Sequence, residues 1–233
     1  FAYIDKNVEI GNNCTIMPYA SVLNGTRMGD GNEVYQSVVL GAVPQDFNYR
    51  GGDTILEIGN NNVFRENVVI SRSSGSEGKT VIGNDNSLME GVHICHDVRV
   101  GDHCVLGLKS IVAGNCIIES HVIFSSMVSM FQDTHVGNWT MVRGGCRFRK
   151  DIPPYIVTST NPTSYYGVNV KYLRFHDVPE KIIEHIAHAY ELIYHGNVSI
   201  QDAAMRVEEE VPMSDEIRNI INFVKHSQKG IIK

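Results

Sequence analysis

The sequence predicts a parallel β-helix followed by a small helical region, and three observations carry this prediction. Apolar residues recur at every sixth position through most of the first 150 residues, two segments interrupt that count, and helical periodicity begins near residue 177. A period of six fits neither an amphipathic helix nor a simple alternating strand. It is typical of a coil with three short parallel strands, in which eighteen residues complete one turn.

The repeat is most regular after Ile82. Steps of six from this residue reach apolar side chains only: Leu88, Ile94, Val100, Leu106, Val112, Ile118, Phe124, Met130, Val136, Val142 and Phe148. Shorter series run from Ile4 to Leu40 and from Ile58 to Ile70. Each of these anchor residues is expected to point into the coil and to pack on the anchor of the next coil. Glycine follows many anchors, as at Gly83 and Gly101, and is expected at the corners.

Two segments break the count of six. The first runs from Gly41 to Ile55 and the second from Ser71 to Val81, and both are rich in glycine, proline or serine. Insertions in a solenoid project from the coil as loops and often form its working face. We therefore expect these two loops to wall a site.

The repeat stops after Asp151, at Pro153 and Pro154, so we predict a repeat domain over 1–152 and a linker with a helical domain over 153–233. Asp177 is expected to cap a first helix with an apolar stripe, and Ser199 and Ser214 to cap two more. The stripe consists of Ile182, Ile183, Ile186, Tyr190 and Ile193. The helices are expected to cover the open end of the solenoid, with a share in binding as the alternative.

Composition limits the classes of function. The net charge of -6 argues against a general affinity for nucleic acid, which needs a clustered positive surface. The five cysteines are scattered without a C-x-x-C pair, so neither a disulfide framework nor a cysteine zinc site is indicated. Neither a transmembrane segment nor a signal peptide is visible. We expect a cytoplasmic protein with small-molecule or protein partners.

The chemistry that the coil presents centres on His96. His93 and His96 flank the inward anchor Ile94, so both are expected outside the core. Asp97 follows His96 directly and is placed to orient an imidazole that acts as a general base. Gly114 lies eighteen residues after His96, one coil further on the same face. Its backbone N–H is a candidate donor to an oxyanion.

A zinc site is the competing interpretation of the histidines. His103 and His121 are also eighteen residues apart and are expected to stack on neighbouring coils. No third histidine follows at one or two further coils, whereas zinc needs at least three protein ligands. We therefore expect no metal.

Five segments together resemble a known family: His93–Asp97, Gln45–Asp46, Asp151–Tyr155, Gly167–Asn169 and Lys229–Lys233. Over essentially its whole length the chain resembles the UDP-N-acetylglucosamine O-acyltransferases. The resemblance implies a left-handed parallel β-helix of hexapeptide repeats, a small C-terminal α-helical domain, and a homotrimer with active sites between subunits. The implied reaction moves a 3-hydroxyacyl chain from acyl carrier protein to the 3-hydroxyl of a UDP-amino sugar, UDP-N-acetylglucosamine. This is the first step of lipid A biosynthesis and uses no cofactor.

The resemblance also implies a role for each matching residue. The catalytic matches are His96 as general base, Asp97 as its acidic neighbour and Gly114 as the oxyanion glycine. The substrate-binding matches are Gln45, Asp46 and His93 in the cleft, Asn169 beside the nucleotide and Gly144 at the position that gauges acyl length.

The chain departs from the family pattern at charged and histidine positions. Where the family has a lysine in the cleft, this chain has Asn48, and two cleft histidines of the family are replaced by Asn115 and Phe131. A histidine of the linker is replaced by Pro162 and a glutamate by Lys171. The arginine pair that the family has beside the nucleotide phosphates is replaced by Phe175 and His176. Lys171 and Arg174 are the nearby cations that can replace the arginine pair. Three hypotheses follow: an acyltransferase of the lipid A pathway, a paralogue that acylates another acceptor, and a non-catalytic trimeric binding protein.

Overall fold

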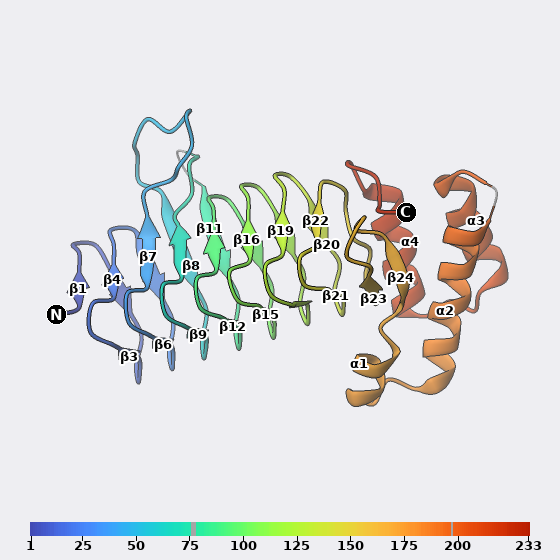
Figure 1. The fold of residues 1–233 in the computed structure, drawn as a ribbon, viewed down its shortest axis with the longest axis horizontal. Helices are drawn as coiled ribbons and strands as arrows, with labels where there is room; N and C mark the ends of the chain where they lie inside the picture. Colours follow the sequence, from blue (N-terminus) through green and yellow to red (C-terminus); the bar gives the residue numbers. More distant parts are fainter. Residues whose placement is uncertain (76–77, 197) are drawn as a thin grey trace.

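The computed structural model describes residues 1–75, 78–196 and 198–233, and it shows a left-handed parallel β-helix with helices at one end (Figure 1). From β1 to β22, every third strand lies in the same sheet, as a coil of eighteen residues requires. The first sheet contains β1 (Tyr3–Ile4), β4 (Ser21–Val22), β7 (Val39–Ala42), β10 (Val69–Ser71), β13 (His93–Ile94), β16 (Ile111–Val112), β19 (Ser129–Met130) and β22 (Arg147–Phe148).

The other two faces of the coil are built in the same way. The second sheet contains β2 (Glu9–Ile10), β5 (Thr26–Met28), β8 (Ile55–Ile58), β11 (Lys79–Ile82), β14 (Arg99–Val100), β17 (Ile117–Ile118) and β20 (His135–Val136). The third contains β3 (Thr15–Ile16), β6 (Glu33–Val34), β9 (Val63–Phe64), β12 (Ser87–Leu88), β15 (Val105–Leu106), β18 (Ile123–Phe124), β21 (Met141–Val142), β23 (Ile156–Thr158) and β24 (Tyr165–Val168).

The predicted anchors from Val22 onward form the core, whereas Ile4 in the first coil is 51% exposed because no coil precedes it in the structure. Ile82 pairs with Val100, and Val100 with Ile118, in the register of eighteen residues that the sequence predicts. Every anchor from Ile82 to Phe148 is buried. The expected β-helix and its six-residue register are therefore confirmed. Each coil buries its apolar face only against the coils on either side, so the unbroken series of anchors is what makes the core continuous.

The close packing of neighbouring coils at the corners explains why glycine follows many anchors. A Cβ on Gly83 would lie 2.4 Å from an Asp102 carboxylate oxygen and 2.6 Å from the Gly101 carbonyl oxygen, so the close approach of the next coil requires glycine there. The left-handed backbone falls two residues later, at Asp85 with φ 56°. Residues with positive φ recur every six positions along the coil, and Asp97 with φ 61° is one of them.

The two insertions leave the coil as loops, as predicted, and residues 76–77 of the second one lie outside the described residues. The longer one, between β7 and β8, projects furthest from the coils (Figure 1). The Arg72 side chain, at the start of the second insertion, holds the first one in place. Its guanidinium donates to Thr54 Oγ1 at 3.1 Å, to the Gly41 carbonyl at 3.0 Å and to the Tyr49 hydroxyl at 3.2 Å. The hydrogen bond from Arg72 to the Tyr49 hydroxyl also lowers the pKa of Tyr49.

Four helices follow the coils: α1 (Val170–Phe175), α2 (Glu180–His195), α3 (Ile200–Glu210) and α4 (Asp215–His226). They lie at the C-terminal end of the solenoid (Figure 1). The fully buried Tyr190 of α2 donates its hydroxyl to the Pro154 carbonyl at 2.5 Å, and Asn219 of α4 donates to Asn138 Oδ1 at 2.9 Å. These contacts join the helices to the last coil.

The helix caps agree with the sequence in two of three cases. The Ser199 and Ser214 hydroxyls accept from the backbone N–H groups of Asp202 and Ile217, as predicted. The prediction for Asp177 was wrong. This residue has left-handed backbone with φ 57°, and α2 begins after Pro179, whose side chain makes no cap hydrogen bond.

The third sheet continues beyond residue 152, because β23 pairs with β21 and β24 pairs with β23. The division into 1–152 and 153–233 stays a prediction. Among the helices of the described ranges, none combines the length and the apolar composition that a bilayer span requires.

Candidate active site

A polar cleft of about 910 Å³ lies where the two insertions meet one corner of the coil. Both insertions contribute to its wall, so the two loops border a cleft; that this cleft is the functional site stays a prediction. The lining residues are Gln45, Asp46, Phe47, Asn48, Ser74, Gly75, Gly78, Lys79, His96, Asp97, Arg99, Asn115 and Gln132.

His96 and Asp97 form a hydrogen-bonded pair in this cleft. His96 Nδ1 lies 2.7 Å from Asp97 Oδ2, and the two side chains are 13% and 21% exposed. Because the left-handed turn at Asp97 places consecutive side chains side by side, neighbours in sequence can make this contact. An ionised carboxylate only accepts hydrogen bonds, so Nδ1 carries the proton and the lone pair of the neutral ring is at Nε2.

Asp97 is held by the second insertion. Its carboxylate accepts hydrogen bonds from the Ser73 hydroxyl and, at 2.8 Å, from the Ser74 hydroxyl. Its backbone N–H donates to Thr80 Oγ1 at 2.9 Å. Burial opposes ionisation of Asp97, but the hydrogen bonds from Ser73, His96 and Ser74 outweigh it and leave the pKa lowered. The carboxylate is therefore ionised at neutral pH and fixes the orientation of the imidazole.

Gly114 lies directly against the His96 ring, one coil further along. A Cβ at Gly114 would be 2.6 Å from His96 Cε1 and 2.9 Å from Nε2, so the ring occupies the space that any side chain would need. Within the described part of the chain, the Gly114 N–H donates to no backbone carbonyl. The geometry brings together the predicted base, its orienting carboxylate and the predicted oxyanion glycine.

The first insertion adds an acidic wall. Gln45 and Asp46 line the cleft as predicted, and the Asp46 carboxylate accepts the Asn48 backbone N–H at 2.8 Å. This hydrogen bond, with a smaller contribution from the Ser74 hydroxyl, lowers the pKa of Asp46. Asn48 also lines the cleft and contributes no charge to it.

Three predicted residues lie outside this cleft of the single chain. His93 is in β13 between Val69 and Ile111 of the neighbouring strands, and its partial burial lowers its pKa. Gly144 lies in a corner where a Cβ would be 3.1 Å from the Ser126 carbonyl oxygen. Asn169 is buried and donates to the Trp139 carbonyl at 3.0 Å. Their roles in substrate binding stay predictions.

Other cleft residues were missed from the sequence. Gln132 carries a usable signal, because it lies eighteen residues after Gly114 on the same corner. No sequence motif predicts that Lys79 and Arg99 line the cleft. Lys79 forms an ion pair with Glu57, with 2.5 Å between Nζ and Oε2. Ser73 and Ser74 were noted as part of the second insertion, but their contact with Asp97 depends on the path of that loop.

His103 and His121 stack with ring centroids 4.9 Å apart, and His121 stacks on Trp139 at 4.0 Å. Burial, and then the neighbouring imidazoles of His103 and His176, lower the pKa of His121. In residues 1–75, 78–196 and 198–233, no group of three or more His, Cys, Asp or Glu side chains is placed to hold a metal ion. The pair is part of an aromatic ladder on the coil surface.

Phe175 and His176 stand at the positions where the resemblance implies an arginine pair. Phe175 is 79% exposed, and the His176 ring packs edge-on against Trp139. Arg174, a predicted substitute, donates from Nε to Glu180 at 2.9 Å, so its charge is already paired.

Comparison with known proteins decides the family. Residues 151–232 match the model for domain 2 of UDP-N-acetylglucosamine O-acyltransferase, and residues 7–42 and 79–107 match the bacterial transferase hexapeptide model. The structure is similar to a UDP-N-acetylglucosamine acyltransferase from Bacteroides fragilis, with 41% identity, a TM-score of 0.95, and coverage of 100% of this chain and 98% of that one. The chain belongs to the UDP-N-acetylglucosamine acyltransferase family.

Other members of the family are similar over the same length. The enzyme from Acinetobacter baumannii is 30% identical, with a TM-score of 0.85 and coverage of 100% of this chain and 95% of that one. The Francisella novicida UDP-N-acetylglucosamine acyltransferase is 26% identical, with a TM-score of 0.96 and coverage of 100% of this chain and 86% of that one. As a member of this acyltransferase family the chain is an acyltransferase, which argues against the non-catalytic hypothesis.

Proposed function

We propose that this acyltransferase moves a 3-hydroxyacyl chain from acyl carrier protein to the 3-hydroxyl of UDP-N-acetylglucosamine, with His96 as the general base. Nε2 of His96 removes the hydroxyl proton as the sugar oxygen attacks the thioester carbonyl carbon. The Gly114 N–H donates to the oxyanion of the tetrahedral intermediate. The intermediate then collapses with cleavage of the C–S bond and expels the carrier thiolate, which takes the proton from the imidazolium of His96 and leaves as the thiol.

One observation carries this proposal: the His96 ring is oriented by an ionised Asp97 on one side and lies against Gly114 on the other. The first contact leaves the Nε2 lone pair free, and the second puts a candidate oxyanion donor beside it. A base and an oxyanion donor within reach of one reacting carbon are what acyl transfer to a hydroxyl needs.

His96→Ala tests the proposed base. Loss of a general base lowers the rate about 10²- to 10⁴-fold, so the variant should lose transfer by that factor while keeping its fold and oligomeric state. The assay is mass-spectrometric detection of acylated sugar made from acyl carrier protein thioester. His188→Ala is the matched control, because His188 lies on the surface of α2, where it contacts Glu191. Unchanged transfer by His96→Ala would eliminate the proposed base.

A different acceptor is the second candidate, and the neutral Asn48 and Asn115 in the cleft favour it. Each stands where the family has a side chain able to carry positive charge, and phosphate recognition relies on such groups. This candidate predicts that thioester is consumed with another hydroxyl or amine acceptor but not with the UDP-sugar. Transfer to UDP-N-acetylglucosamine alone, across a panel of acceptors, would exclude it.

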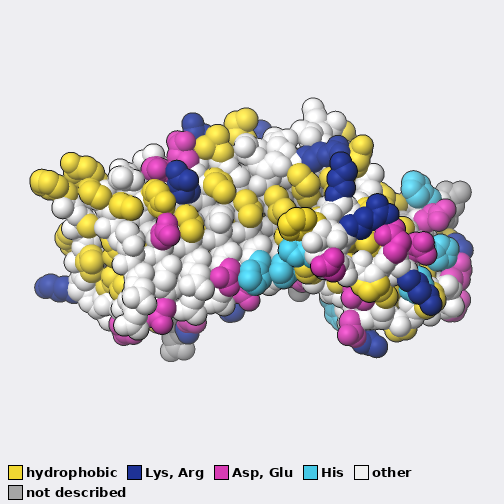
Figure 2. Space-filling view, turned by 90° about the horizontal axis from the view of Figure 1, so that it is seen from below, with side chains coloured by type: hydrophobic (Ala, Val, Ile, Leu, Met, Phe, Trp, Pro, Cys, Tyr) yellow, Lys and Arg dark blue, Asp and Glu magenta, His cyan; other side chains and the backbone are white. Residues whose placement is uncertain are grey.

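We also propose that the protein is a homotrimer whose sites lie between subunits. Exposed apolar side chains occur along the coils, including Leu108, Ile111, Ile117 and Met127. Figure 2 shows hydrophobic side chains at several places along the solenoid. A neighbouring subunit can bring its Gly144 or Asn169 to the cleft, which a single chain does not. Light scattering after gel filtration should give three times the chain mass, and a monomer would contradict the proposal.

A further inference from the structure

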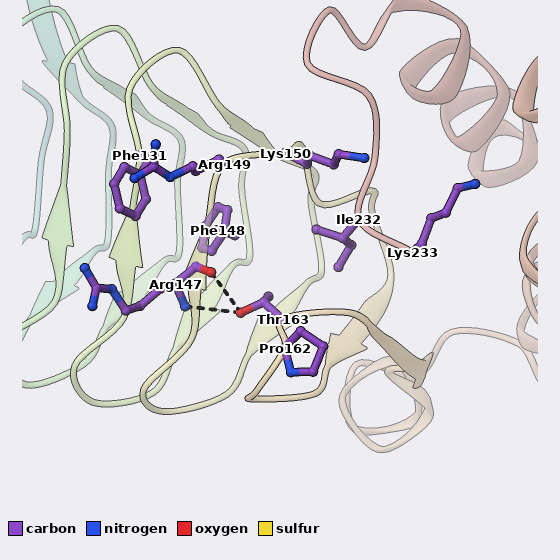
Figure 3. Close-up of a pocket in the computed structure, with 9 residues that line it drawn as sticks. All are labelled: Phe131, Arg147, Phe148, Arg149, Lys150, Pro162, Thr163, Ile232 and Lys233. Carbon is purple, nitrogen blue, oxygen red and sulfur yellow. Dashed lines mark hydrogen bonds between the residues drawn. The ribbon is translucent and has the colours of Figure 1, made fainter.

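A basic pocket lies beside the cleft, at the C-terminal end of the coils. Its volume is about 430 Å³. The pocket is lined by Phe131, Arg147, Phe148, Arg149, Lys150, Pro162, Thr163, Ile232 and Lys233 (Figure 3). Four of these nine side chains are cationic and none is acidic. Such a concentration of positive charge is unexpected in a chain of net charge -6.

The arginines of this pocket are held without a carboxylate. The Arg149 guanidinium carbon lies 4.1 Å from the centre of the Phe131 ring and that of Arg147 lies 6.0 Å from it. Arg147 is also fixed through its backbone, since its N–H donates to Thr163 Oγ1 at 3.1 Å (Figure 3). Stacking on an aromatic face restrains a guanidinium while leaving the N–H groups on its edge free to bind a ligand.

The charges of these residues are also unpaired. In the part of the chain that the structure describes, Arg27, Arg174 and several other cations form ion pairs, whereas Arg147, Arg149 and Lys150 are in none of them. All three side chains are exposed. An anion that enters the pocket therefore meets free donors and displaces no acidic partner.

The pocket lies within reach of the reacting centre. Phe131 lines the basic pocket while its neighbour Gln132 lines the His96 cleft, so the two hollows share one turn of the coil. Steps of eighteen residues lead from His96 to Gly114, Gln132 and Lys150. Each step is about 4.8 Å, which places Lys150 about 14 Å from His96 along the solenoid. An extended substrate with its reactive group at His96 can place its other end here.

We propose that Arg147, Arg149 and Lys150 bind a phosphate group of a substrate during acyl transfer. The inference rests on the proposed function, in which both substrates carry phosphate at a distance from the reacting atom. The acceptor carries a nucleoside diphosphate, and the acyl carrier holds its thiol on a pantetheine arm joined through a phosphodiester. The guanidinium fork matches phosphate oxygens in a bidentate geometry, and a lysine adds a point charge. The arginines of the pocket supply a permanent positive charge, which neither Phe175 nor His176 provides.

Binding measured without turnover tests the pocket by itself. UDP and 4′-phosphopantetheine are titrated by calorimetry into the wild type, Arg149→Gln, Arg149→Lys and Lys181→Gln. We expect at least one probe to bind the wild type, with affinity about tenfold weaker in Arg149→Gln and intermediate in Arg149→Lys, which keeps the charge without the fork. Lys181→Gln removes an equal charge from the exposed face of α2 and should bind normally. Equal affinity in wild type and Arg149→Gln, or no binding of either probe by the wild type, would overturn the proposal.

Steady-state kinetics then identifies the source of the phosphate. If the pocket holds the nucleotide, Arg149→Gln raises KM for UDP-N-acetylglucosamine about tenfold and leaves KM for the acylated carrier unchanged; if it holds the pantetheine arm, the pattern reverses. A wild type that binds a probe through Arg149 but transfers no acyl chain would refute the proposed function and leave the phosphate site standing. Unchanged KM for both substrates in an active Arg149→Gln enzyme would refute a role in transfer.

Discussion

Replacement of Gly114 by alanine is the substitution whose effect the structure defines best. The added Cβ would lie 2.6 Å from His96 Cε1, and the three atoms nearest to it all belong to the His96 ring. Carbon atoms in ordinary contact are about 3.5 to 4.0 Å apart, so the ring has to move by about 1 Å. Movement of this size disrupts the 2.7 Å hydrogen bond to Asp97 that orients the base. The fold survives because a side chain, and not the backbone, is displaced.

A displacement of about 1 Å at a catalytic group costs about 10²-fold in rate, or about 2.7 kcal/mol of activation free energy. We therefore expect Gly114→Ala to lower kcat about 100-fold, measured as acyl transfer under saturating substrates. Gly167→Ala is the matched control, because a Cβ there meets no atom within 4 Å. In a His96→Ala background the added alanine should slow the reaction little further, since the ring that it displaces is gone. Wild-type kcat in Gly114→Ala, or a second 100-fold loss in the double variant, would refute this reasoning.

Three further predictions follow from the buried and stacked groups. Ser74→Ala removes a hydrogen bond to ionised Asp97 and should lower the free energy of unfolding by about 1 to 2 kcal/mol at pH 7. Because the folded pKa of Asp97 is lowered, this difference should disappear as pH falls through that pKa in denaturant titrations; a difference independent of pH would contradict it. Burial raises the pKa of Cys104 to about 12, so this thiol should resist alkylation at pH 8 until the protein unfolds, as peptide mass mapping would show. In a His176→Ala background, which removes the other imidazole beside Trp139, the fluorescence of this one tryptophan should be quenched by protonated His121 with a midpoint below pH 6.5; a higher midpoint would contradict the lowered pKa of His121.

The coil was predictable from the sequence because the pairing of its strands follows from counting residues. Once the period of six is recognised, the offset of eighteen residues fixes which side chains stack, and Ile94, Val112 and Met130 pair as expected. The same offset predicts that Gly114 lies against His96. The essential contact of the candidate site thus follows from spacing before any loop is placed.

Contacts that depend on inserted or connecting segments were not predictable. The Ser73 and Ser74 hydroxyls reach Asp97 through the path of the first residues of the second insertion, and the six-residue repeat does not set that path. The pairing of Arg174 with Glu180 depends on the turn between α1 and α2. The conformation of that turn also explains why Asp177 does not cap α2 as predicted. Its left-handed backbone removes the geometry in which the Asp177 carboxylate would accept a hydrogen bond from a backbone N–H of the helix.

The stoichiometry of a single-turnover reaction tests the central claim most directly. Acylated carrier protein, UDP-N-acetylglucosamine and excess enzyme are mixed, and free carrier thiol and sugar ester are counted together by mass spectrometry. The account predicts one ester on the sugar 3-hydroxyl for each thiol released, with both products lost in His96→Ala and retained in His188→Ala. Thiol release without sugar ester, or ester formation that survives the loss of His96, would contradict it.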